Sequence, residues 1–229
     1  MAIDMELEAV LRPHQYEMPP YPPKMITLAN GKVMVVRQAQ REDVPAILKS
    51  VHPCLFIERD YYDIVSARLY GELLAWYRYR VKSEYCLMGQ VDGYLVGIVN
   101  GRMETEKVGM SYHTLAIDRG LRIGSHLFAA KMEYHLEYLN QEEVLIVAES
   151  PIGFRRWMIE YPLEKTTIPH ELGGGDSYRL TREIYFKAKP RLVVGDRPVP
   201  QHLMDEAIED IKFADDETIR ERIAGLKGR

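Results

Sequence analysis

The stretch His113-Thr-Leu-Ala-Ile-Asp-Arg-Gly-Leu-Arg-Ile-Gly-Ser-His-Leu127 joins a predicted strand to a predicted helix through a short loop. The first turn of a helix offers unpaired N–H groups and the positive end of the helix dipole, so it can bind an anion. The loop adds glycines that permit a close backbone approach, a hydroxyl group and two cations: Gly120, Gly124, Ser125, Arg119 and Arg122. The pattern favours phosphate binding. The alternative is an ordinary strand-to-helix connection with solvated arginines.

Two other phosphate-binding motifs are absent from the sequence, and this narrows the choice of ligand. The chain has no Gly-Lys-Ser/Thr motif, so it is not a Walker-type nucleotide binder. It also has no Gly-x-Gly-x-x-Gly motif, which disfavours a dinucleotide-binding fold.

The segments on either side of this loop alternate between strand and helix patterns. Apolar residues recur at helical spacing over 41–51, and Asp92-Gly93 signals a tight hairpin between two strands. The continuous apolar run Val144–Ala148 is typical of a strand covered on both faces. Strands are predicted at about 32–37, 85–91, 94–103, 110–118, 144–148 and 177–186, and helices at about 41–51, 59–82, 122–139 and 151–161. We therefore expect an α/β (α+β) fold with a single mixed, mostly antiparallel central sheet flanked by helices.

Two segments resemble a known family. Arg119-Gly-Leu-Arg-Ile-Gly-Ser125 is similar to the pyrophosphate loop of the GNAT superfamily of N-acetyltransferases, Q/R-x-x-G-x-G/A. The opening Val33-Met-Val-Val-Arg-Gln-Ala39, followed by Glu42-Asp-Val-Pro-Ala-Ile-Leu48, is similar to the family's first strand and helix. The resemblance covers about 33–186. It implies a GNAT-like fold and an acyl-CoA-dependent N-acyltransferase, with acetyl-CoA or another acyl-CoA as co-substrate and a primary amine as acceptor.

The resemblance also implies which residues would bind CoA. The backbone at Leu115 and Ile117 would lie along the pantetheine arm, and the loop from Arg119 to Ser125 would contact the pyrophosphate. The implied cofactor-binding residues are Leu115, Ile117, Arg119, Gly120, Arg122, Ile123, Gly124, Ser125, Ser150 and Trp157. Catalysis would be direct attack of the neutral amine on the thioester in a ternary complex.

Three residues are candidates for proton transfer. His113 lies on the strand before the loop and has an intrinsic pKa suited to a base, although a strand histidine can simply face the core or solvent. Glu149 follows the buried strand, where burial would raise its pKa, or it is a solvated carboxylate. Tyr161 is the candidate acid, with plain packing as the alternative. The tyrosine-rich helix 59–82 either walls an acceptor cleft or faces the sheet.

Three positions depart from the family pattern. Arg122 stands where the first loop glycine is usual, and Ser150 stands where an asparagine is frequent. Trp157 stands where the family often has the tyrosine that protonates the departing thiolate, and an indole cannot act as that acid. A second function is therefore kept, that of a catalytically degenerate GNAT-like module that binds CoA or an effector.

Composition limits the possible partners. The 229 residues are 46% hydrophobic and 28% charged with a net charge of −4, which provides no long-range attraction for nucleic acid or an anionic membrane. Cys54 and Cys86 lack metal-ligand spacing, so we expect no metal. The N-terminus is acidic and without an apolar stretch, and Val144–Ala148 is too short to span a bilayer. A cytoplasmic location is expected.

The two ends of the chain lie outside the resemblance. We expect a Pro-rich extension at 1–24, a GNAT-like domain at 25–188, and a linker with a helical tail at 189–229. The tail carries two apolar stripes, Met204, Ala207, Ile208 and Ile211, then Ile219, Ile223 and Leu226. Such short helices are seldom stable alone, so the stripes must cover this domain, a second copy or another partner. A homodimer is favoured because symmetric dimers are common.

Overall fold

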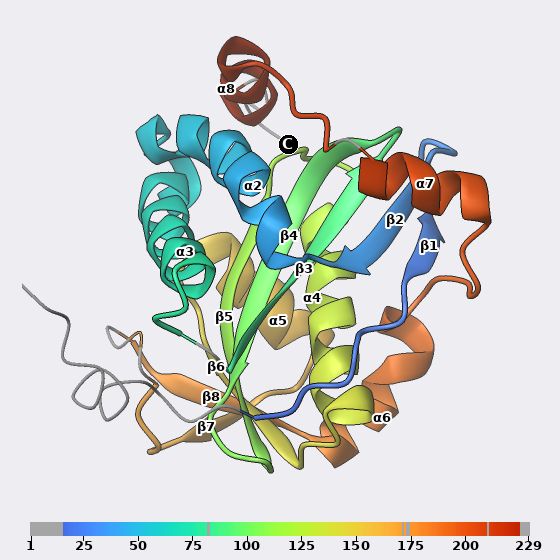
Figure 1. The fold of residues 1–229 in the computed structure, drawn as a ribbon. Helices are drawn as coiled ribbons and strands as arrows, with labels where there is room; N and C mark the ends of the chain where they lie inside the picture. Colours follow the sequence, from blue (N-terminus) through green and yellow to red (C-terminus); the bar gives the residue numbers. More distant parts are fainter. Residues whose placement is uncertain (1–15, 82, 171, 173–174, 210, 225–229) are drawn as a thin grey trace, which may run out of the picture.

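The computed structural model describes residues 16–81, 83–170, 172, 175–209 and 211–224, and within them the strands form one eight-stranded sheet (Figure 1). The strand order is β1-β2-β3-β4-β5-β6-β8-β7. Neighbours are antiparallel except for β5 and β6, which are parallel. The strands are β1 (Lys24–Thr27), β2 (Val33–Gln38), β3 (Glu84–Val91), β4 (Tyr94–Met103), β5 (Val108–Ala116), β6 (Glu143–Val147), β7 (Glu164–Thr166) and β8 (Ser177–Thr181). The predicted mixed, mostly antiparallel sheet is confirmed.

Helices cover both faces of this sheet (Figure 1). They are α2 (Val44–Val51), α3 (Tyr62–Tyr77), α4 (Ile123–Glu133), α5 (Pro151–Glu160), α6 (Arg182–Leu192), α7 (Gln201–Glu209) and α8 (Asp216–Ala224). Short turns of other helix types precede α2 and α3 and follow α2 and α4, at η1 (Arg41–Asp43), η3 (Arg59–Tyr61), η2 (His52–Phe56) and η4 (Tyr134–Tyr138). Helices α2, α3 and α8 pack on one face, and α4, α5 and α6 pack on the other.

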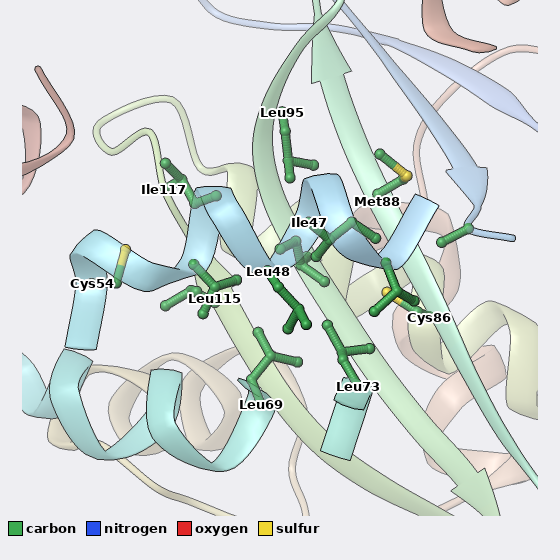
Figure 2. Packing of buried hydrophobic residues seen from close by; sticks show 14 of the residues in the cluster. Ile47, Leu48, Cys54, Leu69, Leu73, Cys86, Met88, Leu95, Leu115 and Ile117 are labelled. Carbon is green, nitrogen blue, oxygen red and sulfur yellow. The ribbon is translucent and has the colours of Figure 1, made fainter. Parts of the chain in front are cut away.

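Alternating side chains of β3 divide the core between the two faces. Cys86 and Met88 point toward α2 and α3, where Figure 2 shows Ile47 and Leu73 packed against the sheet. Tyr85 and Leu87 join the cluster under α4. This period of two explains why all eight residues of β3 are buried. Both cysteines of the chain are buried and free.

The predicted last strand, 177–186, is wrong in its second half. The strand ends at Thr181, whose hydroxyl accepts a hydrogen bond from Ile184 N at 3.4 Å and caps α6. Helix α6 then runs to Leu192, through Pro190 and past the predicted boundary at 188. Tyr185, Ala188 and Leu192 are buried at helical spacing, so the helical period of burial replaces the strand alternation after the cap.

The helical tail packs on its own domain. Ile211, Ile219 and Ile223 join the core under α2 and α3, and Ala207 is buried. The chain beside them follows β4, with Leu95 N donating to Lys212 O at 2.8 Å. Ile208 is 58% exposed, so the first predicted stripe is only partly covered. Leu226 lies outside the described residues. The homodimer stays a prediction, which light scattering tests.

A buried carboxylate joins the two ends of the domain. Glu133 on α4 accepts hydrogen bonds from Tyr21 Oη at 2.7 Å and Lys24 Nζ at 2.8 Å. Arg197, in the segment after α6, donates to both oxygens at 3.1 and 3.2 Å. Burial opposes ionisation of Glu133, but the hydrogen bonds from Arg197 and Lys24 outweigh it and lower the pKa of this carboxyl. The Pro-rich N-terminal segment is thereby held against the domain at Tyr21.

We predict that Glu133→Gln destabilises the protein by about 3 kcal/mol at neutral pH, because Lys24 and Arg197 lose their shared counter-charge in a buried position. A depressed folded-state pKa contributes stability that is present above the unfolded value of about 4.3 and is lost as pH falls through the folded value. The parent should therefore lose stability below about pH 4, and the gap to the variant should narrow there.

Urea unfolding at pH 7 and at several acid pH values measures both effects. The control is Glu142→Gln, which removes the exposed partner of Lys107 and should leave the curves unchanged. If the difference in unfolding free energy between the parent and Glu133→Gln stayed constant across the acid range, the lowered pKa of Glu133 would be contradicted.

Candidate functional site

An extra residue in β5 shapes the site. Ser111 lies opposite Gly101 of β4, whereas Thr114 lies opposite Val99. Three steps along β5 thus match two steps along β4, so Tyr112 and His113 together face one residue, Asn100. This is a β-bulge, which bends the strand and increases its twist.

The bulge coincides with the point where β5 and β6 part. The two strands pair from Val108 opposite Glu143 to Ser111 opposite Ile146, and within the described residues of both strands no pair follows. From Tyr112 onward, β5 diverges from β6, and a cleft opens between them.

The cleft is lined by the end of β5, the loop before α4, and the first turns of α3, α4 and α5. Ten of the residues predicted from the sequence line it: Leu115, Arg119, Gly120, Arg122, Ile123, Gly124, Ser125, Glu149, Ser150 and Trp157. Tyr62, from the helix expected to wall an acceptor cleft, also lines it, and the lining residues not predicted from the sequence are Asp60, Val65, Thr114, Ala116, Asp118, Ile152, Gly153 and Arg156. Ile117 instead lies in the core under α2 (Figure 2), and Tyr161 lies in the apolar cluster with Phe128.

The loop before α4 explains the unusual Arg122. This residue has φ 60° and ψ 21°, the left-handed region where glycine is favoured, and it is the N-cap of α4. Its side chain extends out of the loop, and Nη2 donates to Glu160 Oε1 at 2.7 Å. Arg119 donates in the same way to Asp60 Oδ2 at 2.8 Å. Both loop arginines thus lie at the cleft with a carboxylate partner, beside the unpaired N–H groups of the first turn of α4.

Burial and capping place two further cleft residues. Ser150 is the N-cap of α5 and accepts from Gly153 N at 3.1 Å, so its hydroxyl is already engaged at the helix start. Trp157, about two turns later, stacks on Phe128 with ring centroids 4.7 Å apart. The Tyr161 hydroxyl is buried and has no hydrogen-bond partner among the described residues, and burial raises the pKa of this group above its usual value.

We predict that Arg122→Gly is more stable than Arg122→Ala by about 1 kcal/mol, because both lose the Glu160 contact but only glycine relieves the left-handed backbone. Lys187, exposed within α6, gives the opposite order as a control: there alanine should be more stable than glycine by about 1 kcal/mol. Urea unfolding of the four variants measures both differences. The same order at both positions would rule out backbone strain at Arg122.

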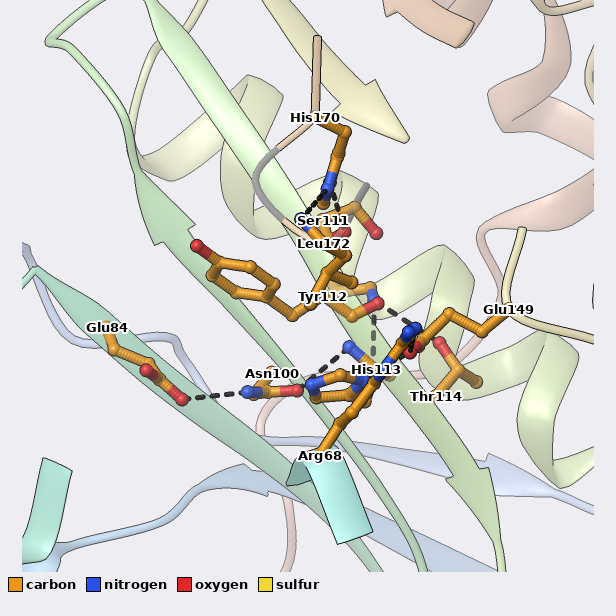
Figure 3. Close-up of polar contacts among 11 residues, drawn as sticks. Arg68, Glu84, Asn100, Ser111, Tyr112, His113, Thr114, Glu149, His170 and Leu172 are labelled. Atoms are coloured by element: carbon orange, nitrogen blue, oxygen red, sulfur yellow. Dashed lines mark hydrogen bonds and ion pairs between the residues drawn. The ribbon is translucent and has the colours of Figure 1, made fainter. Parts of the chain in front are cut away.

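His113, Glu149 and Arg68 form a hydrogen-bonded triad (Figure 3), of which Glu149 lines the cleft while His113 is buried behind it. His113 Nδ1 lies 2.7 Å from Glu149 Oε2, and Arg68 Nη1 donates to Glu149 Oε1 at 3.0 Å. An ionised carboxylate only accepts, so the His113 Nδ1 carries a proton and donates it to this hydrogen bond. The Nε2 atom is buried and has no hydrogen-bond partner in the part of the chain that the structure describes.

The triad corrects the expectation for Glu149. Burial does oppose its ionisation, but the hydrogen bonds and charges of His113 and Arg68 outweigh burial, so the pKa of Glu149 is lowered. The expected increase was wrong because the partners are 36 and 81 residues away in sequence. His113 faces this carboxylate rather than solvent.

A second groove adjoins the cleft at Glu149 and Ser150. Its other lining residues are Tyr61, Ala148, Pro151, Phe154 and Arg155. Tyr61 is 52% exposed here, while Tyr62 is buried and donates to Ala116 O at 2.7 Å. Tyr62 therefore lines the cleft and Tyr61 lines the groove, and Glu149 lies at both.

Solved structures share this arrangement of sheet and helices. No protein-family model and no curated protein matches the sequence. An uncharacterized protein from Bacillus halodurans matches with a TM-score of 0.54 at 11% identity, over 74% of this chain and 95% of that chain. A protein described as a "putative acetyltransferase" from T. thermophilus matches with a TM-score of 0.50 at 12% identity, over 78% of this chain and 97% of that chain. The chain has the GNAT fold. The PaiA N-acetyltransferase of Thermoplasma acidophilum, solved with coenzyme A, matches with a TM-score of 0.45 at 12% identity, over 65% of this chain and 98% of that chain.

Two further observations concern metal binding and membrane insertion. Among the residues described here, no three His, Cys, Asp or Glu side chains gather into a group that could hold a metal ion. No helix within the same residues is long and apolar enough to cross a bilayer.

Proposed function

We propose that the protein is an acyl-CoA-dependent N-acyltransferase that transfers an acyl group, such as acetyl, to a primary amine. The observation that carries this proposal is the cleft beside the end of β5, which is lined by the start of α4, by two arginines and by Glu149, the carboxylate that pairs with His113. The GNAT fold supports the same function. One cleft thus offers an anion site and a proton acceptor.

The CoA moiety fits the cleft by the chemistry of its walls. Arg119, Arg122 and the N–H groups of the first turn of α4 would bind the pyrophosphate. The edge of β5 at Thr114–Ala116 would accompany the pantetheine arm, because backbone amides of that arm can pair with a strand edge. Ile117 is not part of this proposal, since it is buried in the core.

The acceptor amine would enter through the groove between Tyr61 and Phe154. Glu149 lines both openings, so its carboxylate can meet an amine that approaches from the groove while the thioester lies in the cleft. As the nitrogen bonds to the acyl carbon and the carbon–sulfur bond breaks, CoA leaves as the thiolate and the amine proton passes to Glu149. His113 and Arg68 hold that carboxylate in place.

A second function is favoured by one observation. Trp157 lines the cleft where an acid would act, and the nearest alternative, Tyr161, is buried in the apolar cluster. A domain that binds CoA or an effector without turning it over would have no need of such an acid.

We predict that CoA raises the melting temperature of the parent in proportion to the logarithm of its concentration, because a ligand that binds the folded state stabilises it. Arg122→Glu should abolish this shift, since it places a negative charge against the pyrophosphate. Lys187→Glu makes the same charge change on α6 and should keep the shift. Equal shifts in all three proteins would refute the assignment of the loop.

We predict that Glu149→Gln lowers the rate of thiol release from acetyl-CoA by about 10² to 10⁴ with amine acceptors, while CoA affinity stays the same. His113→Ala should lower the rate in the same direction, because Glu149 loses the group that orients it. A panel of primary amines and a thiol reagent measure the rate, and Glu142→Gln is the exposed control. A parent that binds CoA but releases no thiol with any amine would favour the binding module.

A further inference from the structure

A lysine is buried directly behind the bulge. Lys131, two turns into α4, is fully buried, and its Nζ donates to the carbonyl oxygens of Tyr112 and His113 at 3.1 Å each. The same Nζ lies 3.2 Å from Thr114 Oγ1. Figure 3 shows these three consecutive residues of β5 between the Glu84–Asn100 contact and Glu149. Lys131 is not among the residues predicted from the sequence.

The three contacts suit the charged form of the lysine. An ammonium group has three N–H donors and a neutral amine has two, so three acceptors match the ammonium. Burial lowers the pKa of Lys131 to about 7, and the negative charge of Glu149 acts in the opposite direction. A buried cation is stable only where its hydrogen bonds are satisfied, and here all three are.

The three acceptors belong to the part of β5 that follows its last pair with β6. Tyr112 and His113 are the two bulged residues, and Thr114 is the first residue beyond them that lines the cleft. On the β4 side, Asn100 Oδ1 accepts from His113 N at 3.0 Å, in place of a strand hydrogen bond. Asn100 is itself held by Glu84 Oε1 at 2.7 Å. The bulge is therefore fixed by side chains from β4 and from α4.

We propose that Lys131 is a positioning residue, whose ammonium group fixes the bulge and thereby sets the edge of β5 along which the pantetheine arm of CoA lies. This rests on the proposed function. Lys131 does not act on the reacting atoms, since its three N–H groups are already bound to β5. Its effect on ligand binding is confined to the arm and does not extend to the pyrophosphate, which binds two turns away at the start of α4.

The test compares two ligands that share an adenosine and a 5′-diphosphate: CoA also carries the pantetheine arm and a 3′-phosphate, and ADP carries neither. Isothermal titration calorimetry measures the affinities of CoA and ADP for the parent and for Lys131→Met, which keeps the length of the side chain and removes its charge. CoA affinity should fall about tenfold or more, since hydrogen bonds from a charged group are lost, and ADP affinity should stay within about twofold. Lys107→Met, on an exposed lysine, should change neither.

Two results would overturn the proposal: an unchanged CoA affinity, or an equal loss for both ligands, which would indicate general damage to the domain. A parent that binds neither ligand would instead refute the proposed function, and this inference with it. If Lys131→Met does not fold, Thr114→Val removes one acceptor with little change in shape. It should lower CoA affinity about threefold and spare ADP, and equal affinities for parent and variant would refute the role of Lys131.

Hydrogen exchange provides a readout that needs no ligand. In Lys131→Met, the backbone amides of 112–116 should exchange faster than in the parent, because the carbonyls of the bulge lose their common donor. The amides of β1 and β2 should exchange at the parent rate. Unchanged exchange in 112–116 would show that the ammonium does not fix the bulge.

Discussion

The extra residue in β5 is the constraint on which the site depends. A strand that gains one residue against its antiparallel neighbour must bend, and β5 bends away from β6 after Ser111. The backbone groups released by this divergence cannot be left without partners in the interior. Asn100 and Lys131 satisfy them on the inner side, and a ligand's amides would complete the pairing at the cleft. Hydrogen bonds from polar side chains thus keep β5 apart from β6 at the cleft.

Charge balance around the cleft follows from the same geometry. Three arginines that line the cleft or contact Glu149 each have a carboxylate partner: Arg119 has Asp60, Arg122 has Glu160, and Arg68 has Glu149. Because Arg122 is 54% exposed at its side chain, its pair with Glu160 is weak in water and open to competition by a phosphate. Glu149 differs, since it is buried between two donors and its charge is fixed by them.

The sequence predicts the parts of this molecule that depend on local patterns. The loop from Arg119 to Ser125 lies in the cleft because strand-loop-helix signals and glycines act over neighbouring residues. The pairing of His113 with Glu149, and of Lys131 with the bulge, joins residues far apart in the chain, and no local pattern carries such contacts. The end of β8 was missed for a related reason: Ser177–Phe186 alternates like a strand, and only burial against α4 and β6 shows the helical period from Arg182.

The partners of Glu133 come from far along the chain in both directions. Tyr21 and Lys24 precede it by 112 and 109 residues, and Arg197 follows it by 64. On a ribosome, which extends chains from the N-terminus, helix α4 emerges with two of its partners made and the third still to be synthesised. The isoleucines of α8 that complete the core under α2 emerge later still. The domain therefore reaches its native state only after α8 has been synthesised, and a chain terminated before α8 would expose apolar surface to chaperones and proteases.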